Sequence, residues 1–413
     1  MRLSLTLASI TLISSSTQSH AFSVRSSTSS LSIRNAVHTE RQASASVMMT
    51  TTESSVESDD TPETQGKSNQ LAILTFDLDD TLYPISTIID EANSAFARSM
   101  KQFGFDDIVP SDIVETGKRI RSEMAEIDPE RSACLTHTET RQLAIREEME
   151  KIEYQRKLQA CADDWATNVS SLSPLVVENA KKWATRAISP SVVQAVLNAW
   201  EMERHHAAER HLYPEVMDML EQIREEYPNV VIGAVTDGKA NPLFMTFTLA
   251  KYFDFCVNWE DDQAGRKKFF TDLGNVEKDA DLKWIYSATK DKGMELVETG
   301  ANLRGDTFPE PDKEYVWIHV GDDLALDVGG AATCGAKTIL TELADKQYHQ
   351  TARHRFDDID EENTENVAAW SITPKNELLR REKMNEDAMD LVDKKVAFLS
   401  HVPEAIKNIL NDE

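Results

Sequence analysis

Four short apolar runs, each followed at once by polar residues, constrain the fold of this chain more than any other feature. The runs are LAILTF (71–76), VVIGAV (230–235), FCVNW (255–259) and VWIHV (316–320), and a fifth run, KTIL (337–340), comes later. Their apolar residues are continuous rather than alternating, as in strands buried on both faces of a parallel sheet. Residues 214–226, just before the second run, carry apolar residues at helical spacing. The pattern predicts a Rossmann-like, doubly wound parallel sheet of the α/β class.

A long insertion is expected between the first two strands. Residues 77–229 separate them, which is far more chain than a crossover helix needs. Helical spacing of apolar residues recurs over residues 88–102, 111–125, 139–160 and 190–210. We therefore expect residues 91–204 to form a helical cap domain, inserted into a core of residues 71–90 and 205–413.

The core itself is expected to carry a second, smaller insertion. Residues 345–390 are acidic and polar, without the spacing of a helix or a strand, and are predicted to be loop-rich. The apolar segment 396–409 is then predicted to return to the sheet as an edge element and a helix.

The first 70 residues differ in composition from the rest. An apolar stretch of signal-peptide length follows Arg2, and residues 1–21 are predicted to be a signal peptide. Residues 22–70 are Ser/Thr-rich, and the first acidic residue is Glu40, which favours a transit peptide that leads into a disordered linker. A signal peptide followed by a transit peptide resembles the bipartite presequence of algal plastid proteins. We expect a plastid (chloroplast) location; secretion with a Ser-rich linker is the alternative.

The charge of the chain argues against two classes of partner. The formal net charge is −27, which would repel nucleic-acid backbones and anionic membrane surfaces. No segment after the presequence is apolar enough to span a bilayer. We therefore expect no nucleic acid and no membrane as a partner of the mature protein, whose oligomeric state stays open.

Polar residues that follow the strands are expected to meet at the carboxyl edge of the parallel sheet. They are Asp77 and Asp79 after the first run, Thr236, Asp237 and Gly238 after the second, Lys268 after the third, and Asp322, Asp323 and Asp327 after the fourth. One carboxylate can attack phosphorus and another can handle a proton, provided that a cation screens their repulsion. Carboxylates are ligands that Mg²⁺ prefers, and a hydroxyl, N–H groups and a lysine can hold phosphoryl oxygens. The set predicts a phosphoryl-transfer site with Mg²⁺ as its cofactor.

The same residues resemble the motifs of the haloacid dehalogenase (HAD) superfamily. The segments are DLDDT (77–81), VTDG (235–238), a lysine near 268 and GDDLALD (321–327), in the order that the superfamily has. The resemblance implies that Asp77 is the nucleophile that forms an aspartyl-phosphate, and that it is also a Mg²⁺ ligand. It implies that Asp79 is the acid and base and a Mg²⁺ ligand through its backbone carbonyl. Asp322 would be the metal ligand from the fourth strand.

The remaining motif residues have supporting roles in this resemblance. Asp323 and Asp327 would ligate the metal through water or orient the lysine. Thr236 and the N–H groups of Asp237 and Gly238 would hold the phosphoryl group, and Thr81 would support the loop. The segment GRKKFF departs from the pattern, because no proline follows its lysine. Lys268 is favoured as the motif lysine, with Lys267 as the alternative.

The substrate prediction rests on resemblance as well. LTFDLDDTLY, GRKKFF and IHVGDDLALDVGGAATCGAKT are similar to the bacterial phosphatases that act on 5-amino-6-(5-phospho-D-ribitylamino)uracil in riboflavin biosynthesis. A nucleotide monophosphate, phosphoglycolate, a sugar phosphate, or a catalytically silent binding role are the alternatives. In the cap, Arg141 lies on a predicted helix and is a candidate for substrate binding. A position on a solvated helix face is the other interpretation of Arg141.

Overall fold

The core of the protein is a six-stranded sheet. The computed structural model describes residues 69–236, 238–260, 279–300, 314–344, 348, 350 and 383–411. The strands are β1 (Asn69–Phe76), β2 (Val231–Thr236), β3 (Phe255–Asn258), β4 (Glu314–Gly321), β5 (Lys337–Thr341) and β6 (Lys394–Val396). Their order is β3-β2-β1-β4-β5-β6, and every neighbouring pair is parallel. The predicted α/β class with a doubly wound parallel sheet is confirmed.

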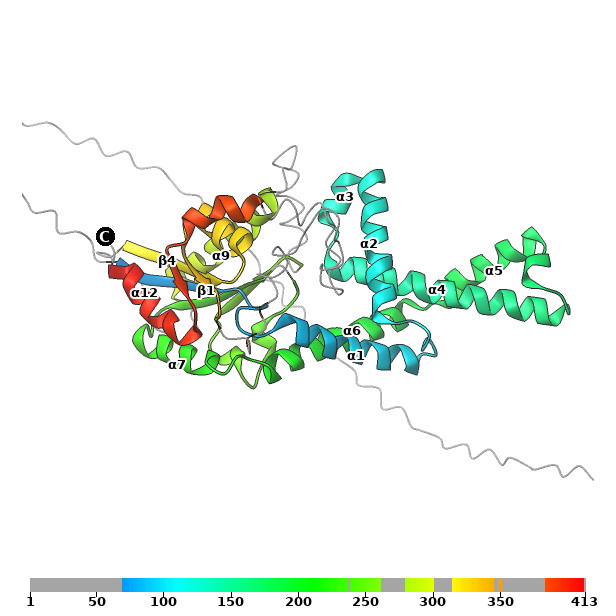
Figure 1. The fold of residues 1–413 in the computed structure, drawn as a ribbon, viewed down its shortest axis with the longest axis horizontal. Coiled ribbons are helices and arrows are strands. Elements are labelled where there is room, and N and C mark those ends of the chain that lie inside the picture. Colours follow the sequence, from blue (N-terminus) through cyan, green and yellow to red (C-terminus); the bar gives the residue numbers. More distant parts are fainter. Residues whose placement is uncertain are drawn as a thin grey trace, which may run out of the picture. The chain divides into compact units, whose positions relative to one another are not determined.

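Helices cover both faces of the sheet, which explains the continuous apolar runs. On one face, Leu74 and Phe76 of β1 share a hydrophobic cluster with residues of α7 (Val216–Glu226) and α12 (Val402–Asn411). On the other face, Ala72 and Ile73 share a cluster with residues of α9 (Asp279–Thr299). Figure 1 shows α7 and α12 on one side of β1 and α9 on the other. Neighbouring residues of β1 are therefore buried in different layers.

The stretch between β1 and β2 is helical, as predicted. It contains α1 (Ile85–Gln102), α2 (Pro110–Ile127), α3 (Pro129–Cys134), α4 (His137–Asp164), α5 (Pro174–Ala187) and α6 (Pro190–Arg210). Helix α4 begins with a capping box, in which the Thr136 hydroxyl accepts from the Glu139 N–H and the Glu139 carboxylate accepts from the Thr136 N–H. A separate hydrophobic cluster, with Phe96, Met100 and Trp200 among its members, joins α1 to α6. The predicted cap boundaries at 91 and 204 fall inside α1 and α6. One continuous helix therefore runs through each predicted boundary.

The end of the chain returns to the sheet as predicted. Strand β6 pairs with β5 at the edge, and α12 follows it.

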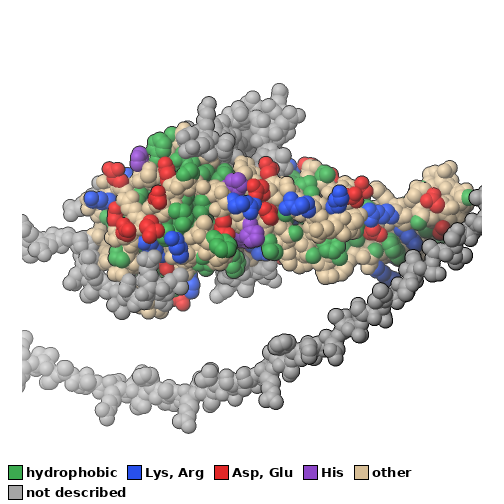
Figure 2. All heavy atoms as spheres, turned by 90° about the horizontal axis from the view of Figure 1, so that it is seen from below, with side chains coloured by type: hydrophobic (Ala, Val, Ile, Leu, Met, Phe, Trp, Pro, Cys, Tyr) green, Lys and Arg blue, Asp and Glu red, His purple; other side chains and the backbone are tan. Residues whose placement is uncertain are grey.

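Most of the predicted insertion lies outside the described residues, including residues 351–382. The predicted presequence and linker, up to residue 68, also lie outside them. Among the described helices, none is long and apolar enough to cross a membrane. Figure 2 shows basic and acidic side chains interspersed on one face.

Candidate active site

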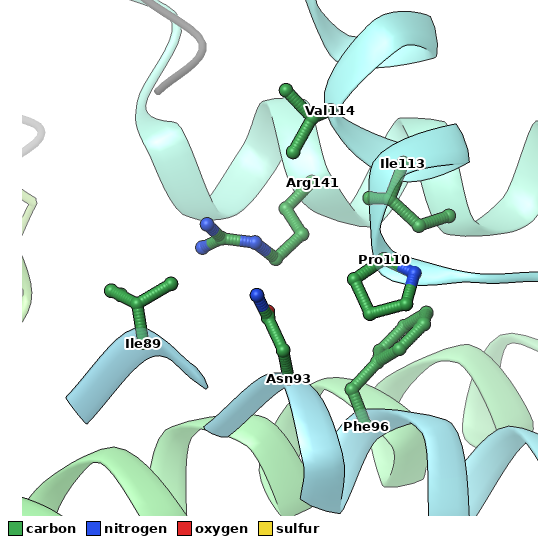
Figure 3. Close-up of a pocket in the computed structure, with 7 residues that line it drawn as sticks. All are labelled: Ile89, Asn93, Phe96, Pro110, Ile113, Val114 and Arg141. Carbon is green, nitrogen blue, oxygen red and sulfur yellow. The ribbon is translucent and has the colours of Figure 1, made fainter. Parts of the chain in front are cut away.

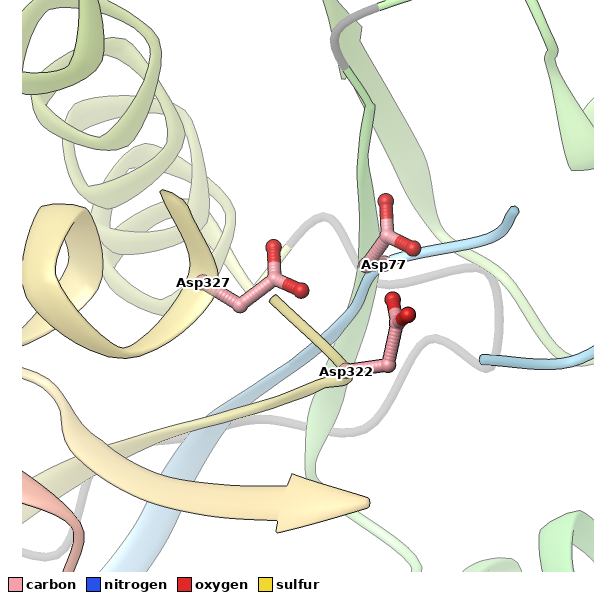
Figure 4. A group of neighbouring side chains, drawn as sticks. All are labelled: Asp77, Asp322 and Asp327. Carbon is pink, nitrogen blue, oxygen red and sulfur yellow. The ribbon is translucent and has the colours of Figure 1, made fainter. Parts of the chain in front are cut away.

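The carboxyl ends of β1 and β4 bring three aspartates together. Phe76 pairs with Val320 in the sheet, and the N–H of Asp77 donates to the carbonyl of Val320 at 2.9 Å. Asp322 follows the end of β4, and Asp327 lies on the helical turn η4 (Leu324–Gly330). Carboxylate oxygens of Asp77, Asp322 and Asp327 all lie within 4.8 Å of one another, and Figure 4 shows the three side chains around one space. We call this set the carboxylate cluster.

The loop after β1 holds the first of these carboxylates in place. Asp80 has a left-handed backbone with a φ of 63°, and its carboxylate accepts from the N–H of Ile85 at 2.9 Å. This turn directs Thr81 back to the cluster. The Thr81 hydroxyl lies 3.1 Å from Asp77 Oδ2 and 3.3 Å from Asp322 Oδ1. Thr81, predicted as a supporting residue, therefore bridges Asp77 and Asp322, two of the three predicted metal ligands.

Asp327 is the most buried member of the cluster and accepts hydrogen bonds from two donors. The hydroxyl of Tyr286 on α9 donates to its Oδ1 at 2.8 Å, and the N–H of Asp323 donates to its Oδ2 at 2.9 Å. His319 Nε2 lies 3.4 Å from Oδ1. A Cβ at Gly321 would lie 2.2 Å from the carboxyl carbon of Asp327. Only a glycine at the end of β4 therefore leaves room for this carboxylate.

A chain of buried hydrogen bonds through Trp317, Thr75 and His319 lies behind Asp327. Trp317 Nε1 can only donate, and it donates to Thr75 Oγ1 at 2.9 Å. The Thr75 hydroxyl lies 2.8 Å from His319 Nδ1 and 3.5 Å from the carbonyl oxygen of Ile318. On the other side of the ring, His319 Nε2 lies 3.4 Å from the Tyr286 hydroxyl and 3.4 Å from Asp327 Oδ1. The support that Tyr286 and His319 give to Asp327 was not predicted, although a histidine inside an apolar strand run is a detectable signal.

The carboxylate cluster suits a hard divalent cation. Burial, followed by the charges of Asp327, Asp322 and Asp79, raises the pKa of Asp77 well above its ordinary value. Such repulsion is relieved when a cation lies among the carboxylates. Because all three members offer only oxygen ligands, the donor set fits Mg²⁺ rather than a softer metal. The predicted cofactor thus has residues that could hold it, and they include Asp327.

Asp79 points to the cap rather than to the carboxylate cluster. Its Oδ2 accepts from Arg204 Nη2 at 2.5 Å, and the exposed fraction of the two side chains is 19% and 9%. Arg204 lies on α6, and a Cβ at Gly238 would lie 3.1 Å from both of its terminal nitrogens. The carboxylate of Asp79 therefore lies between the carboxyl end of β1 and the cap helix α6. Its predicted contribution to the metal through the backbone carbonyl stays a prediction.

The other predicted site residues divide into those that the structure describes and those that it does not. Thr236 is buried at the end of β2, and its hydroxyl accepts from the N–H of Gly238 at 3.3 Å. Asp237, Lys267 and Lys268 lie outside the described residues, so their roles stay predictions.

Arg141 on α4 lies with its guanidinium 3.9 Å from the ring centre of Trp200. It is a partly buried residue of the cap and not one of a solvated face.

The fold and the site together define an α/β protein with a carboxylate cluster at the carboxyl edge of its sheet and a helical insertion beside it. Comparison with protein-family models gives no match, and neither does comparison with curated proteins. Among solved structures, a 2-haloacid dehalogenase from Pseudomonas syringae pv. Tomato is 18% identical, with 82% of this chain and 100% of that chain covered and a TM-score of 0.41. A HAD phosphatase from Thermococcus onnurineus is 14% identical (81% and 98% covered, TM-score 0.32). A predicted phosphoglycolate phosphatase from Haemophilus somnus is 11% identical (66% and 85% covered, TM-score 0.29). The similar structures thus include dehalogenases and phosphatases.

Proposed function

We propose that this protein is a Mg²⁺-dependent phosphatase of the HAD type, which hydrolyses the phosphate monoester of a small metabolite. The observation that carries the proposal is the carboxylate cluster at the carboxyl ends of β1 and β4, with Asp79 directed away from it toward the cap. The resemblance of the segments 77–81, 235–238 and 321–327 to the HAD motifs supports it.

The chemistry follows from the placement of two carboxylates. Asp77 attacks the phosphorus, and the ester oxygen leaves and takes a proton from the carboxyl group of Asp79. Asp79 then removes a proton from a water molecule, which attacks the phosphorus of the aspartyl-phosphate and regenerates Asp77. The Thr236 hydroxyl, which accepts from the N–H of Gly238, would donate its own hydrogen to a phosphoryl oxygen. Mg²⁺ bound by Asp77, Asp322 and Asp327 would offset the negative charge of the phosphoryl group and the carboxylates.

Asp79 and the acidic fourth motif favour phosphatase over dehalogenase chemistry. A halide leaves as a weak base, so a dehalogenase needs neither an acid for its leaving group nor a cation. An alkoxide leaving group needs a proton, and Asp79 lies two residues beyond Asp77 to supply it. The presence of both features supports hydrolysis of an ester.

For the substrate, we propose 5-amino-6-(5-phospho-D-ribitylamino)uracil as the first ester to test. The similarity of the motif segments to the riboflavin-pathway phosphatases supports this choice. A plastid location, proposed from the predicted presequence, would suit this pathway. Nucleotide monophosphates, phosphoglycolate and sugar phosphates are the competing esters.

The decisive experiment measures phosphate release from this panel of esters with Mg²⁺ and with EDTA. Asp77→Asn is expected to lower turnover by at least about 10³-fold, because the nucleophile is lost. Asp90→Asn, which changes an exposed aspartate on α1, is the matched control and is expected to keep full turnover. Preference for another ester would support the phosphatase reaction but reject 5-amino-6-(5-phospho-D-ribitylamino)uracil as the substrate. Absence of both turnover and Mg²⁺ binding would favour a catalytically silent protein.

A further inference from the structure

A pocket in the helical cap is distinct from the carboxylate cluster. It has about 310 Å³ of empty space, including its open mouth. Its lining consists of Ile89, Asn93, Phe96, Pro110, Ile113, Val114 and Arg141, from helices α1, α2 and α4. Asn93 and Arg141 are the polar side chains of this lining, and Figure 3 shows them facing each other across the pocket.

Trp200 determines which end of the Asn93 amide faces the pocket. The indole Nε1 of Trp200 lies 3.1 Å from Asn93 Oδ1. An indole N–H can only donate, so its partner must be the amide oxygen and not the nitrogen. The amide nitrogen of Asn93, with two hydrogens to donate, therefore points toward Arg141, as Figure 3 shows.

Arg141 contributes further donors to the same place. Its guanidinium lies over the Trp200 ring at 3.9 Å, and no group of the described residues accepts a hydrogen bond from it. Burial, followed by the charge of Arg204, lowers the pKa of Arg141 to about 10, so the group keeps its charge at neutral pH. The polar part of the pocket consequently presents donors and a positive charge.

Two contacts connect this part of the cap with the strand ends. Thr138, in the first turn of α4, donates its N–H to Glu260 Oε1 beyond β3 at 3.0 Å. Arg204, which lies 5.9 Å from the same Trp200 ring, donates to Asp79. Arg141 lies one helical turn from Thr138 and shares Trp200 with Arg204. The N–H groups of the Arg141 guanidinium thus lie on the same side of the cap as Arg204, the residue that contacts Asp79.

We propose that Arg141 and Asn93 bind the leaving group of the substrate, and that this group presents acceptor oxygens to them. This inference rests on the proposed phosphatase function and names its substrate class. The oxygens could belong to a carboxylate or to ring carbonyls such as those of a pyrimidinedione, since both accept hydrogen bonds from a guanidinium and an amide. A leaving group that presents a cation or only hydrogens would leave the donors unpaired and is disfavoured.

The test compares esters with and without such oxygens. We expect Arg141→Met to lower kcat/KM by about 10- to 100-fold for the ribitylamino-uracil phosphate or for phosphoglycolate, whichever the wild type prefers. The two esters distinguish ring carbonyls from a carboxylate. Turnover of phenyl phosphate, which lacks acceptor oxygens beyond its phosphate, is expected to stay within about 2-fold in the same variant. Arg141→Lys should retain part of the preference for the ester with acceptor oxygens over phenyl phosphate, because lysine keeps the positive charge.

Arg146→Met is the matched control, since Arg146 lies on the same helix in a partly exposed ion pair with Glu150. An equal loss for phenyl phosphate, or no loss for either preferred ester, would overturn the proposal. Binding of the phosphate-free leaving group, measured by calorimetry on Asp77→Asn with and without Arg141→Met, provides a readout that does not need turnover. If wild-type protein hydrolysed no ester but bound this compound through Arg141, the proposed function would fail while the pocket assignment stood.

Discussion

At the scale of single residues, a missing side chain at the end of β4 controls the geometry of the carboxylate cluster. Gly321 precedes Asp322, and the carboxyl group of Asp327 occupies the space where a Cβ of residue 321 would be. The hydroxyl of Tyr286 and the N–H of Asp323 hold Asp327 in that space. Even one methyl group would therefore separate Asp327 from Asp77 and Asp322.

We predict that Gly321→Ala weakens Mg²⁺ binding by about 10- to 100-fold, because Asp327 must move away from the other two carboxylates. Calorimetric titration with Mg²⁺ measures this change. Gly329→Ala is the control, since a Cβ there would meet Ala388 at 3.3 Å and touch no cluster residue. Equal Mg²⁺ affinity in the two variants would show that Asp327 is not a ligand.

At the scale of elements, a buried ion pair joins α7 to the strands beside it. Arg224, near the end of α7, lies 2.8 Å from Asp254 Oδ2, and the side chains are 5% and 2% exposed. Arg224 also donates to the carbonyl of Val230, and the N–H of Ile232 donates to Asp254. The pair thus fixes the positions of α7, β2 and the start of β3 relative to one another.

We predict that Asp254→Asn lowers the free energy of unfolding by about 3–5 kcal/mol, because the charge of Arg224 would stay buried without its counter-charge. Urea denaturation followed by circular dichroism measures the change. Lys182→Ala breaks the exposed pair with Glu178 and should cost no more than about 0.5 kcal/mol. A similarly small loss for Asp254→Asn would mean that the hydrogen bonds, and not the charge, hold these elements.

At the scale of the whole molecule, most of the sheet was predictable because strands β1 to β5 each carry an apolar run, whereas β6 reads Lys-Lys-Val and has none. The long helices α1, α2, α4 and α6 were predictable from spacing, but α5 was not, since its buried residues Ala180 and Ala184 give a weak signal. The meeting of Asp77, Asp322 and Asp327, which follow β1 and β4, was predictable from the parallel topology alone. Arg204 could not, because its contact with Asp79 spans 125 positions and depends on how α6 packs.

The carboxylate cluster lies between the two central strands, so its charge affects the stability of the whole fold. We predict that Mg²⁺ at about 100 times its dissociation constant raises the free energy of unfolding by about 2.7 kcal/mol, since the ion binds only when the three carboxylates are assembled. Thermal denaturation with Mg²⁺ or EDTA should show a rise of several degrees in Tm for wild type and for Asp90→Asn, and little for Asp322→Asn. The net charge of −27 could also attract Mg²⁺ without a specific site. That effect would appear equally in all three proteins, and an equal rise would therefore contradict a site at the cluster.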